Sequence, residues 1–147
     1  AGDILHNLVL DAPITPDDAV QAASRVGAAR FIERLPERYH HRLGERGRSL
    51  SVGERQLLSF ARALARDPRI LVLDKATSSV DAEAEAQIQL ALAELMAGRT
   101  SIVVAHRRET ILAADRILVL EKGHIAADLR GPEGRARFLE MSAAALD

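Results

Sequence analysis

Residues 50–54 read Leu-Ser-Val-Gly-Glu and residues 70–74 read Ile-Leu-Val-Leu-Asp, and these two stretches decide the fold. Between them, residues 54–66 place apolar side chains at the spacing of one helical face, and Asp67-Pro68 ends that pattern. Residues 70–73 are continuously apolar, which predicts a strand buried on both faces of a sheet. We therefore expect a helix that begins at the first stretch and a buried strand that ends on Asp74.

The chain after residue 74 continues this alternation of helices and apolar strands. Residues 82–97 form a predicted helix with Ile88, Leu92 and Leu95 facing inward, and Gly98 closes it. Short strands are predicted at residues 101–105, 117–120 and 125–127. Strand–helix–strand alternation predicts an α/β fold built on a mostly parallel sheet.

Both ends of the chain are predicted to be mainly helical. Thr15-Pro16-Asp17-Asp18 has the residues of a helix start, with a threonine cap, proline at the first position and acids in the first turn. Residues 129–147 predict a loop at Gly131-Pro132 followed by an amphipathic terminal helix.

Composition narrows the class of protein. The 147 residues are 48% hydrophobic and 3% aromatic, which fits one α/β or α domain with a modest core. The net charge of −1 gives no basic field, so we expect no nucleic-acid partner. The chain has no cysteine for disulfide or thiolate chemistry, and no apolar run approaches the roughly 20 residues of a membrane helix.

Two polar residues follow predicted strands, at the edge where parallel sheets bind ligands. Asp74 follows the strand at residues 70–73, and His106 follows the one at residues 101–105. An aspartate there suits Mg²⁺ held through water, and a histidine there suits contact with a terminal phosphate. Each signal alone favours the plainer alternative, a structural turn for the aspartate and a surface position for the histidine.

Ser51-Val52-Gly53-Glu54 opens the helix that follows it. A serine hydroxyl, a glycine that admits close backbone approach and a helix N-terminus together suit an anion site. The alternative is a plain helix cap, which this motif alone would favour.

Taken in order, these motifs resemble the nucleotide-binding domain of ABC transporters, most closely the exporter branch. Residues 50–54 resemble the signature motif, residues 70–74 the Walker B strand, residues 78–81 the D-loop and His106 the H-loop histidine. Gly44-Glu45-Arg46-Gly47 resembles a loop that exporters carry before the signature. The resemblance implies part of a P-loop NTPase (RecA-like) ABC ATPase core. It assigns residues 1–67 to the helical subdomain with the signature motif, residues 68–128 to the C-terminal part of the core, and residues 129–147 to a C-terminal helix.

The resemblance also implies a ligand set and partners. The ligands are ATP and Mg²⁺, with Asp74 holding the metal through water. The family's pattern places Ser51, Gly53, Glu54 and Asp81 at the nucleotide and makes His106 a catalytic residue. The implied partners are a second nucleotide-binding domain, in a homodimer or heterodimer, and the transporter's transmembrane domain. The implied location is the cytoplasmic face of the cell (inner) membrane.

The sequence departs from the family's pattern in three ways. It contains no Gly-x-x-x-x-Gly-Lys-Ser/Thr, so we expect it to be a C-terminal fragment lacking the Walker A loop. Lys75 stands where the family has a catalytic glutamate, and a protonated lysine cannot accept a proton from water. A degenerate site in a two-subunit exporter and an introduced change both fit Lys75. Val52 and Glu54 replace the commoner glycine and glutamine of the signature.

Two other functions remain open at this point. One is a non-catalytic, ATP-binding regulatory half of a heterodimeric transporter, which Lys75 favours. The other is a soluble ABC ATPase of the DNA-repair or translation type, against which the exporter-like loop before the signature argues.

Overall fold

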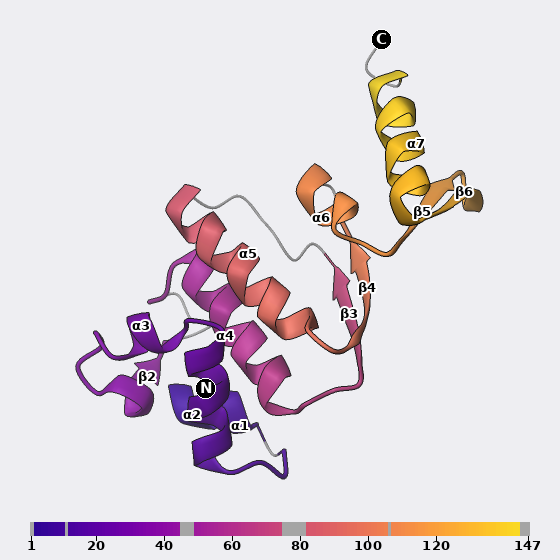
Figure 1. Ribbon diagram of the computed structural model, residues 1–147. Coiled ribbons are helices and arrows are strands. Elements are labelled where there is room, and N and C mark those ends of the chain that lie inside the picture. The colour runs from indigo at the N-terminus through magenta and orange to yellow at the C-terminus, as the bar shows by residue number, and fades with distance from the viewer. Residues whose placement is uncertain (1, 11, 45–48, 75–81, 106, 145–147) are drawn as a thin grey trace. The chain divides into compact units, whose positions relative to one another are not determined.

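The computed structural model describes residues 2–10, 12–44, 49–74, 82–105 and 107–144 (Figure 1). The chain divides into two compact units, Ala1–Val104 and Ala105–Asp147. Lys75, residues 78–81 and His106 lie outside the described residues.

The first unit is mainly helical. Its helices are α1 (Ile4–Val9), α2 (Pro16–Arg25), α3 (Ala29–Ile32), the 3₁₀ turn η1 (Arg38–His40), α4 (Val52–Ala65) and α5 (Ala82–Met96). Helix α4 contacts α1, α2 and α5, so the helix predicted after the first motif is the centre of this part (Figure 1). The predicted inward residues Ile88, Leu92 and Leu95 of α5 are all buried, and Gly98 after it has a φ of 70°.

The start of α2 confirms the predicted cap. The Thr15 hydroxyl accepts a hydrogen bond from the Asp18 N–H at 3.2 Å, and Asp18 accepts one from the Thr15 N–H at 3.0 Å. These bonds satisfy N–H groups that a helix start otherwise leaves open. The hydrogen bonds from Thr15 also lower the pKa of the Asp18 carboxyl.

The beginning of the chain pairs with a later segment through two short strands, which the sequence did not predict. Strand β1 (Gly2–Asp3) pairs antiparallel with β2 (Arg42–Leu43). A two-residue strand is too short for the alternation that identifies strands in a sequence.

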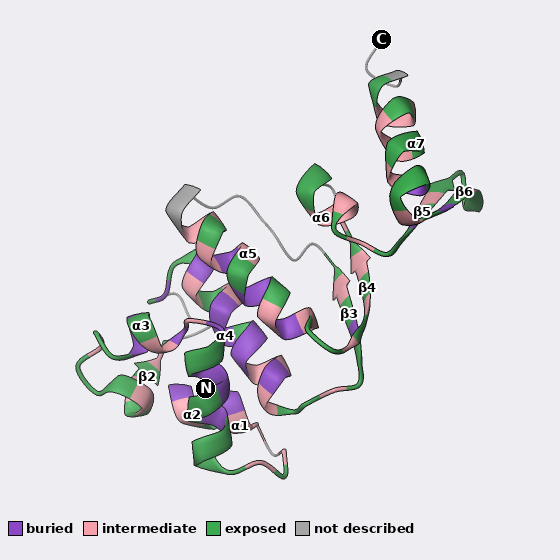
Figure 2. Ribbon diagram, viewed as in Figure 1, coloured by how far each residue is buried: buried purple, intermediate pink, exposed green. Residues whose placement is uncertain are grey.

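Strands β3 (Ile70–Asp74) and β4 (Thr100–Val104) form the predicted parallel pair, with Ile70 beside Thr100 and Asp74 beside Val104. Leu71 belongs to the buried cluster that the helices form, so one face of the pair is covered. The prediction that the strand at residues 70–73 is buried on both faces is wrong, because its other face is exposed (Figure 2). Among the described residues, nothing packs over Val72 and Ile102, which are 69% and 58% exposed.

The second unit contains α6 (Arg108–Leu112), β5 (Arg116–Glu121), β6 (His124–Arg130) and α7 (Gly131–Ala144). Strands β5 and β6 pair antiparallel, so among the described strands parallel pairing is confined to β3 and β4. The reason is local: Lys122 and Gly123 both have positive φ, as a two-residue hairpin turn requires, and such a turn reverses the chain.

Helix α7 corrects the prediction of a loop at Gly131-Pro132, because the helix begins at Gly131. Proline is tolerated in a first turn, where its missing N–H would have no helical partner. Gly134 then brings the helix onto β6: a Cβ at this position would lie 2.8 Å from the backbone carbon of Leu129. The helix therefore packs on the hairpin too closely for any side chain at residue 134.

An exposed ion pair crosses the hairpin. The Arg116 guanidinium donates to both carboxylate oxygens of Asp128, at 2.8 and 2.7 Å. Hydrogen bonding to Arg116 lowers the pKa of Asp128 to about 2. Within the described part of the chain, no helix is both long and apolar enough to cross a bilayer.

Candidate functional site: the start of helix α4

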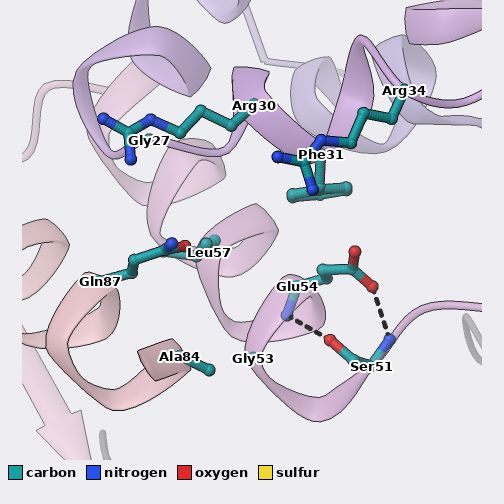
Figure 3. A pocket seen from close by; sticks show the side chains of 10 residues that line it. All are labelled: Gly27, Arg30, Phe31, Arg34, Ser51, Gly53, Glu54, Leu57, Ala84 and Gln87. Atoms are coloured by element: carbon teal, nitrogen blue, oxygen red, sulfur yellow. Dashed lines mark hydrogen bonds between the residues drawn. The ribbon is translucent and has the colours of Figure 1, made fainter. Parts of the chain in front are cut away.

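Ser51 is the N-cap of α4, as the sequence predicted. Its hydroxyl accepts the Glu54 N–H at 3.2 Å, and Glu54 Oε2 accepts the Ser51 N–H at 2.8 Å (Figure 3). This reciprocal pair is a capping box. Ser51 and Glu54 therefore stabilise the helix start, and the motif does act as a helix cap.

The capping box leaves several donors at this helix end for a ligand. The Ser51 hydroxyl oxygen accepts the Glu54 N–H with one of its own lone pairs, so the hydroxyl proton remains able to donate to a ligand. The N–H groups of Val52 and Gly53 belong to the first turn, whose donors have no partner inside a helix. Gly53 has no side chain to keep a ligand away from them. The start of α4 thus has the chemistry to bind an anion, helped by the helix dipole.

A pocket of about 310 Å³ opens at this point. Ser51, Gly53 and Glu54 line it from the start of α4, and Ala84 and Gln87 line it from α5. Across from them, Arg30 and Arg34 come from α3 and the turn after it (Figure 3). The remaining lining residues are Gly27, Phe31 and Leu57.

The charges around this pocket favour an anionic ligand. Arg30 and Arg34 contribute two guanidinium groups and Glu54 one carboxylate, so the lining has a net positive charge. Neither arginine side chain forms an ion pair with another residue in the described ranges. Guanidinium groups match phosphate geometry by paired hydrogen bonds. The arrangement suits binding of a phosphate group.

Asp74 is separate from this pocket. It is the last residue of β3, is exposed, and lies beside Val104 of β4. A lone exposed carboxylate fits a magnesium ion that keeps most of its water ligands. The described residues contain no cluster of three or more His, Asp or Glu side chains that would hold a metal directly. Lys75, Asp81 and His106, the other site residues expected from the sequence, lie outside the described residues.

Sequence analysis missed the arginine side of the pocket. Arg30 and Arg34 are four residues apart, the spacing that puts two side chains on one face of a helical turn. That signal was present in the sequence, but their position opposite Ser51 depends on how α3 folds back toward α4.

Comparison with known proteins shows which family the chain resembles. A family model described as ABC transporter matches residues 4–78, about half of the chain. An uncharacterised ABC transporter ATP-binding protein of Bacillus subtilis is 50% identical over 124 residues, which cover 84% of this chain and 20% of that protein. A β-(1→2)glucan export ATP-binding/permease protein of Rhodopseudomonas palustris is 53% identical over 123 residues, covering 83% and 20%.

Two further relatives extend this result. A multidrug resistance ABC transporter ATP-binding and permease protein of Lactococcus lactis is 46% identical over 127 residues, covering 85% of this chain and 22% of that protein. The solved structure of a bacterial Atm1-family ABC exporter with ATP bound matches with a TM-score of 0.82 and 34% identity. That match covers 99% of this chain and 26% of the exporter chain, so the 147 residues span between a fifth and about a quarter of these relatives.

Proposed function

The chain belongs to the ABC transporter family, and on that premise we propose that it is part of the ATP-binding domain of an exporter, coupling ATP binding and hydrolysis to transport across a membrane. The observation that carries the proposal is the start of α4, where Ser51 and Gly53 open onto a pocket lined by two arginines. The names of relatives such as the glucan exporter supply the class of transporter.

In this proposal the chain has three parts. Residues 1–67 are the helical subdomain, which carries the signature motif at the start of α4. Residues 68–128 are the C-terminal part of the ATPase core, with Asp74 in the Walker B strand. Residues 129–147 are the third part, which contains helix α7. The transmembrane domain and a second nucleotide-binding domain are the proposed partners, and the cytoplasmic face of the membrane is the proposed location.

The residues at the start of α4 would hold the terminal phosphate of ATP. Ser51 would donate its hydroxyl proton, and the N–H groups of Val52 and Gly53 would donate from the first turn. Arg30 and Arg34 would offset the carboxylate of Glu54. ATP bound with Mg²⁺ supplies the phosphoanhydride bond whose hydrolysis drives transport.

The other set of residues would serve a different ATP molecule. In the family, two domains bind two ATP molecules head to tail, and each site combines the Walker motifs of one domain with the signature of the other. Asp74, Lys75, Asp81 and His106 would therefore belong mainly to this domain's own site, and Ser51 to the partner's. Loss of a general base typically slows a reaction about 10²–10⁴-fold, so Lys75 would impair this domain's own site.

Lys75 also supports a second function, a non-catalytic half that binds ATP and regulates its partner. The test is ATP hydrolysis by the complete transporter carrying Lys75→Glu, with Lys75→Gln as the control that removes the charge without adding a base. A rise of tenfold or more for Lys75→Glu alone supports an impaired catalytic site. Equal rates for all three proteins would reject it and favour the regulatory half.

A further inference from the structure

Arg99 lies immediately before β4 and is the most highly connected side chain in the first unit's described residues. Its guanidinium donates to four oxygen atoms: the Pro68 carbonyl at 3.1 Å, the Leu95 carbonyl at 3.0 Å, the Ala97 carbonyl at 3.2 Å and Asp67 Oδ1 at 2.7 Å. The side chain is 10% exposed. A nearly buried arginine with this many partners fixes the segments that surround it.

The partners of Arg99 belong to two separate connections. Asp67 and Pro68 form the turn that leads from the end of α4 into β3. Leu95 and Ala97 lie at the end of α5, where the chain turns into β4. One guanidinium therefore joins the end of α4, the start of β3, the end of α5 and the start of β4.

The turn at Asp67 has a demanding backbone. Asp67 has a φ of 43°, in the left-handed region that few residues other than glycine adopt readily. Its side chain is 87% exposed, so its ion pair with Arg99 contributes little to stability by itself. The bonds to the Pro68 and Leu95 carbonyls are therefore the important ones, because both are partly buried, whereas the bond to the Ala97 carbonyl is exposed.

Fixing these turns also fixes the register of the parallel pair. The Thr100 N–H donates to the Arg69 carbonyl at 3.3 Å, directly beside the Arg99 contacts. From Ile70 beside Thr100 the pairing continues without a shift to Asp74 beside Val104. The position of Asp74, about 13 Å along the strand, is thus determined at the end where Arg99 lies.

We propose that Arg99 is a positioning residue that holds the Asp74-bearing strand β3 in register with β4 and at a fixed position relative to α4, the helix that begins at Ser51. This proposal rests on the proposed function, because it gives Asp74 a metal to hold and Ser51 a phosphate. Ser51 and Asp74 serve different ATP molecules in that scheme, so Arg99 is a mechanical connection between the two nucleotide sites.

The chemistry requires arginine rather than any cation. Lysine has three donors on one nitrogen and cannot reach carbonyl groups on two separate turns as a planar fork does. Arg99→Lys should therefore lose the positioning while keeping the charge. Arg25→Lys is the matched control, since Arg25 forms an exposed bond to Glu94 of α5, at 2.8 Å, that should tolerate lysine.

The first experiment needs no nucleotide. Amide hydrogen exchange on the complete protein compares β3 and β4 with α4. We expect slow exchange along both strands in the wild type, and at least tenfold faster exchange in Arg99→Lys with α4 unchanged. Equal strand protection in the wild type and Arg99→Lys would overturn the proposal. Unprotected strands in the wild type would also overturn it, whatever the behaviour of Arg99→Lys.

The second experiment measures binding of a fluorescent ATP analogue with Mg²⁺ and with EDTA. Arg99→Lys should reduce the gain in affinity that Mg²⁺ brings by roughly tenfold, the lower end for residues that orient metal ligands. Arg25→Lys should leave the gain unchanged, and an unchanged gain in Arg99→Lys would reject the positioning role. If the wild type binds no analogue, the proposed function fails, while the exchange experiment still tests Arg99.

Discussion

The helical part of the first unit buries its apolar side chains, whereas the β3–β4 pair leaves similar side chains exposed on one face. Leu92 of α5 is 1% exposed and packs in one cluster with residues of α1, α2 and α4. Ile70 and Val72 of β3 are equally apolar, yet 63% and 69% exposed (Figure 2). The helices close a core among themselves, whereas a parallel pair needs a layer on each face and has one here.

This difference shows that an apolar side chain is buried only where another element of the chain packs over it. Apolar composition predicts that a strand face will be covered, but only neighbouring elements can cover it. The exposed face is therefore the place in the first unit where a further layer would pack. The variants below test the two regions in order of expected effect.

The largest effect is expected for Leu92→Ala in α5. Removing a fully buried leucine side chain costs about 2–5 kcal/mol of unfolding free energy, since it leaves a cavity that neighbours fill incompletely. The matched control is Leu90→Ala, two residues away on the same helix but 73% exposed, which should cost less than about 0.5 kcal/mol. Urea denaturation measures both. Equal losses would mean that the outer face of α5 is covered and that the comparison above is wrong.

The sequence predicted the helical part well because its signals are local. Ile88, Leu92 and Leu95 recur at helical spacing, and Thr15 and Ser51 are recognisable caps with an acidic residue three positions later. Each signal lies within one turn or two of the helix that it predicts, so no knowledge of distant segments is needed.

The second unit offers a covered strand face for comparison. Gly134 of α7 lies against Leu129 of β6 so closely that a Cβ would be 2.8 Å from backbone. Gly134→Ala should therefore destabilise the unit by about 1–3 kcal/mol, through overpacking. The usual effect of this change in a helix is the opposite, a gain of about 0.5–1 kcal/mol. Thermal unfolding measures whether Gly134→Ala lowers or raises the stability, and Arg137→Ala, at an exposed position of the same helix, is the control. A rise in stability for Gly134→Ala would contradict the close packing of α7 on β6.

The parts that sequence analysis missed depend on distant segments. A continuous apolar run at residues 70–73 identifies a strand, but it does not say which faces are covered. The same limit applies to Arg30 and Arg34, whose four-residue spacing says nothing of Ser51 on the other side of the pocket. The turn at Lys122-Gly123 is different, because positive φ at both residues reverses the chain by local geometry alone.

A smaller effect is expected at the helix start that connects the fold with the proposed site. Ser51→Ala removes the side-chain acceptor for the Glu54 N–H and should cost about 1 kcal/mol. Ser59→Ala, exposed in the middle of α4, is the control and should be neutral or slightly stabilising, because alanine favours helix interiors. Ser51→Asp should keep the stability while adding a negative charge to the pocket. Urea denaturation measures all three, and a neutral Ser51→Ala would show that the capping box does not hold α4.

The smallest effect, and the most informative for the comparison, is expected for Val72→Thr. The two side chains have nearly the same shape, but threonine has a hydroxyl in place of one methyl group, and a hydroxyl is costly only where it is buried without a hydrogen-bond partner. The Val72 side chain is 69% exposed, so water can hydrate the new hydroxyl. We expect less than about 0.5 kcal/mol in the 147-residue chain. Leu71→Ala, on the covered face of the same strand, should cost several times more.

A loss of 2 kcal/mol for Val72→Thr would mean that something covers this face in solution, and repeating the measurement at tenfold dilution would identify it. A loss that shrinks on dilution points to a second copy of the chain, because association stabilises the folded state less as the concentration falls. If the same substitution is nearly neutral here but disruptive in the complete protein, the face is a surface that other parts of that protein bury.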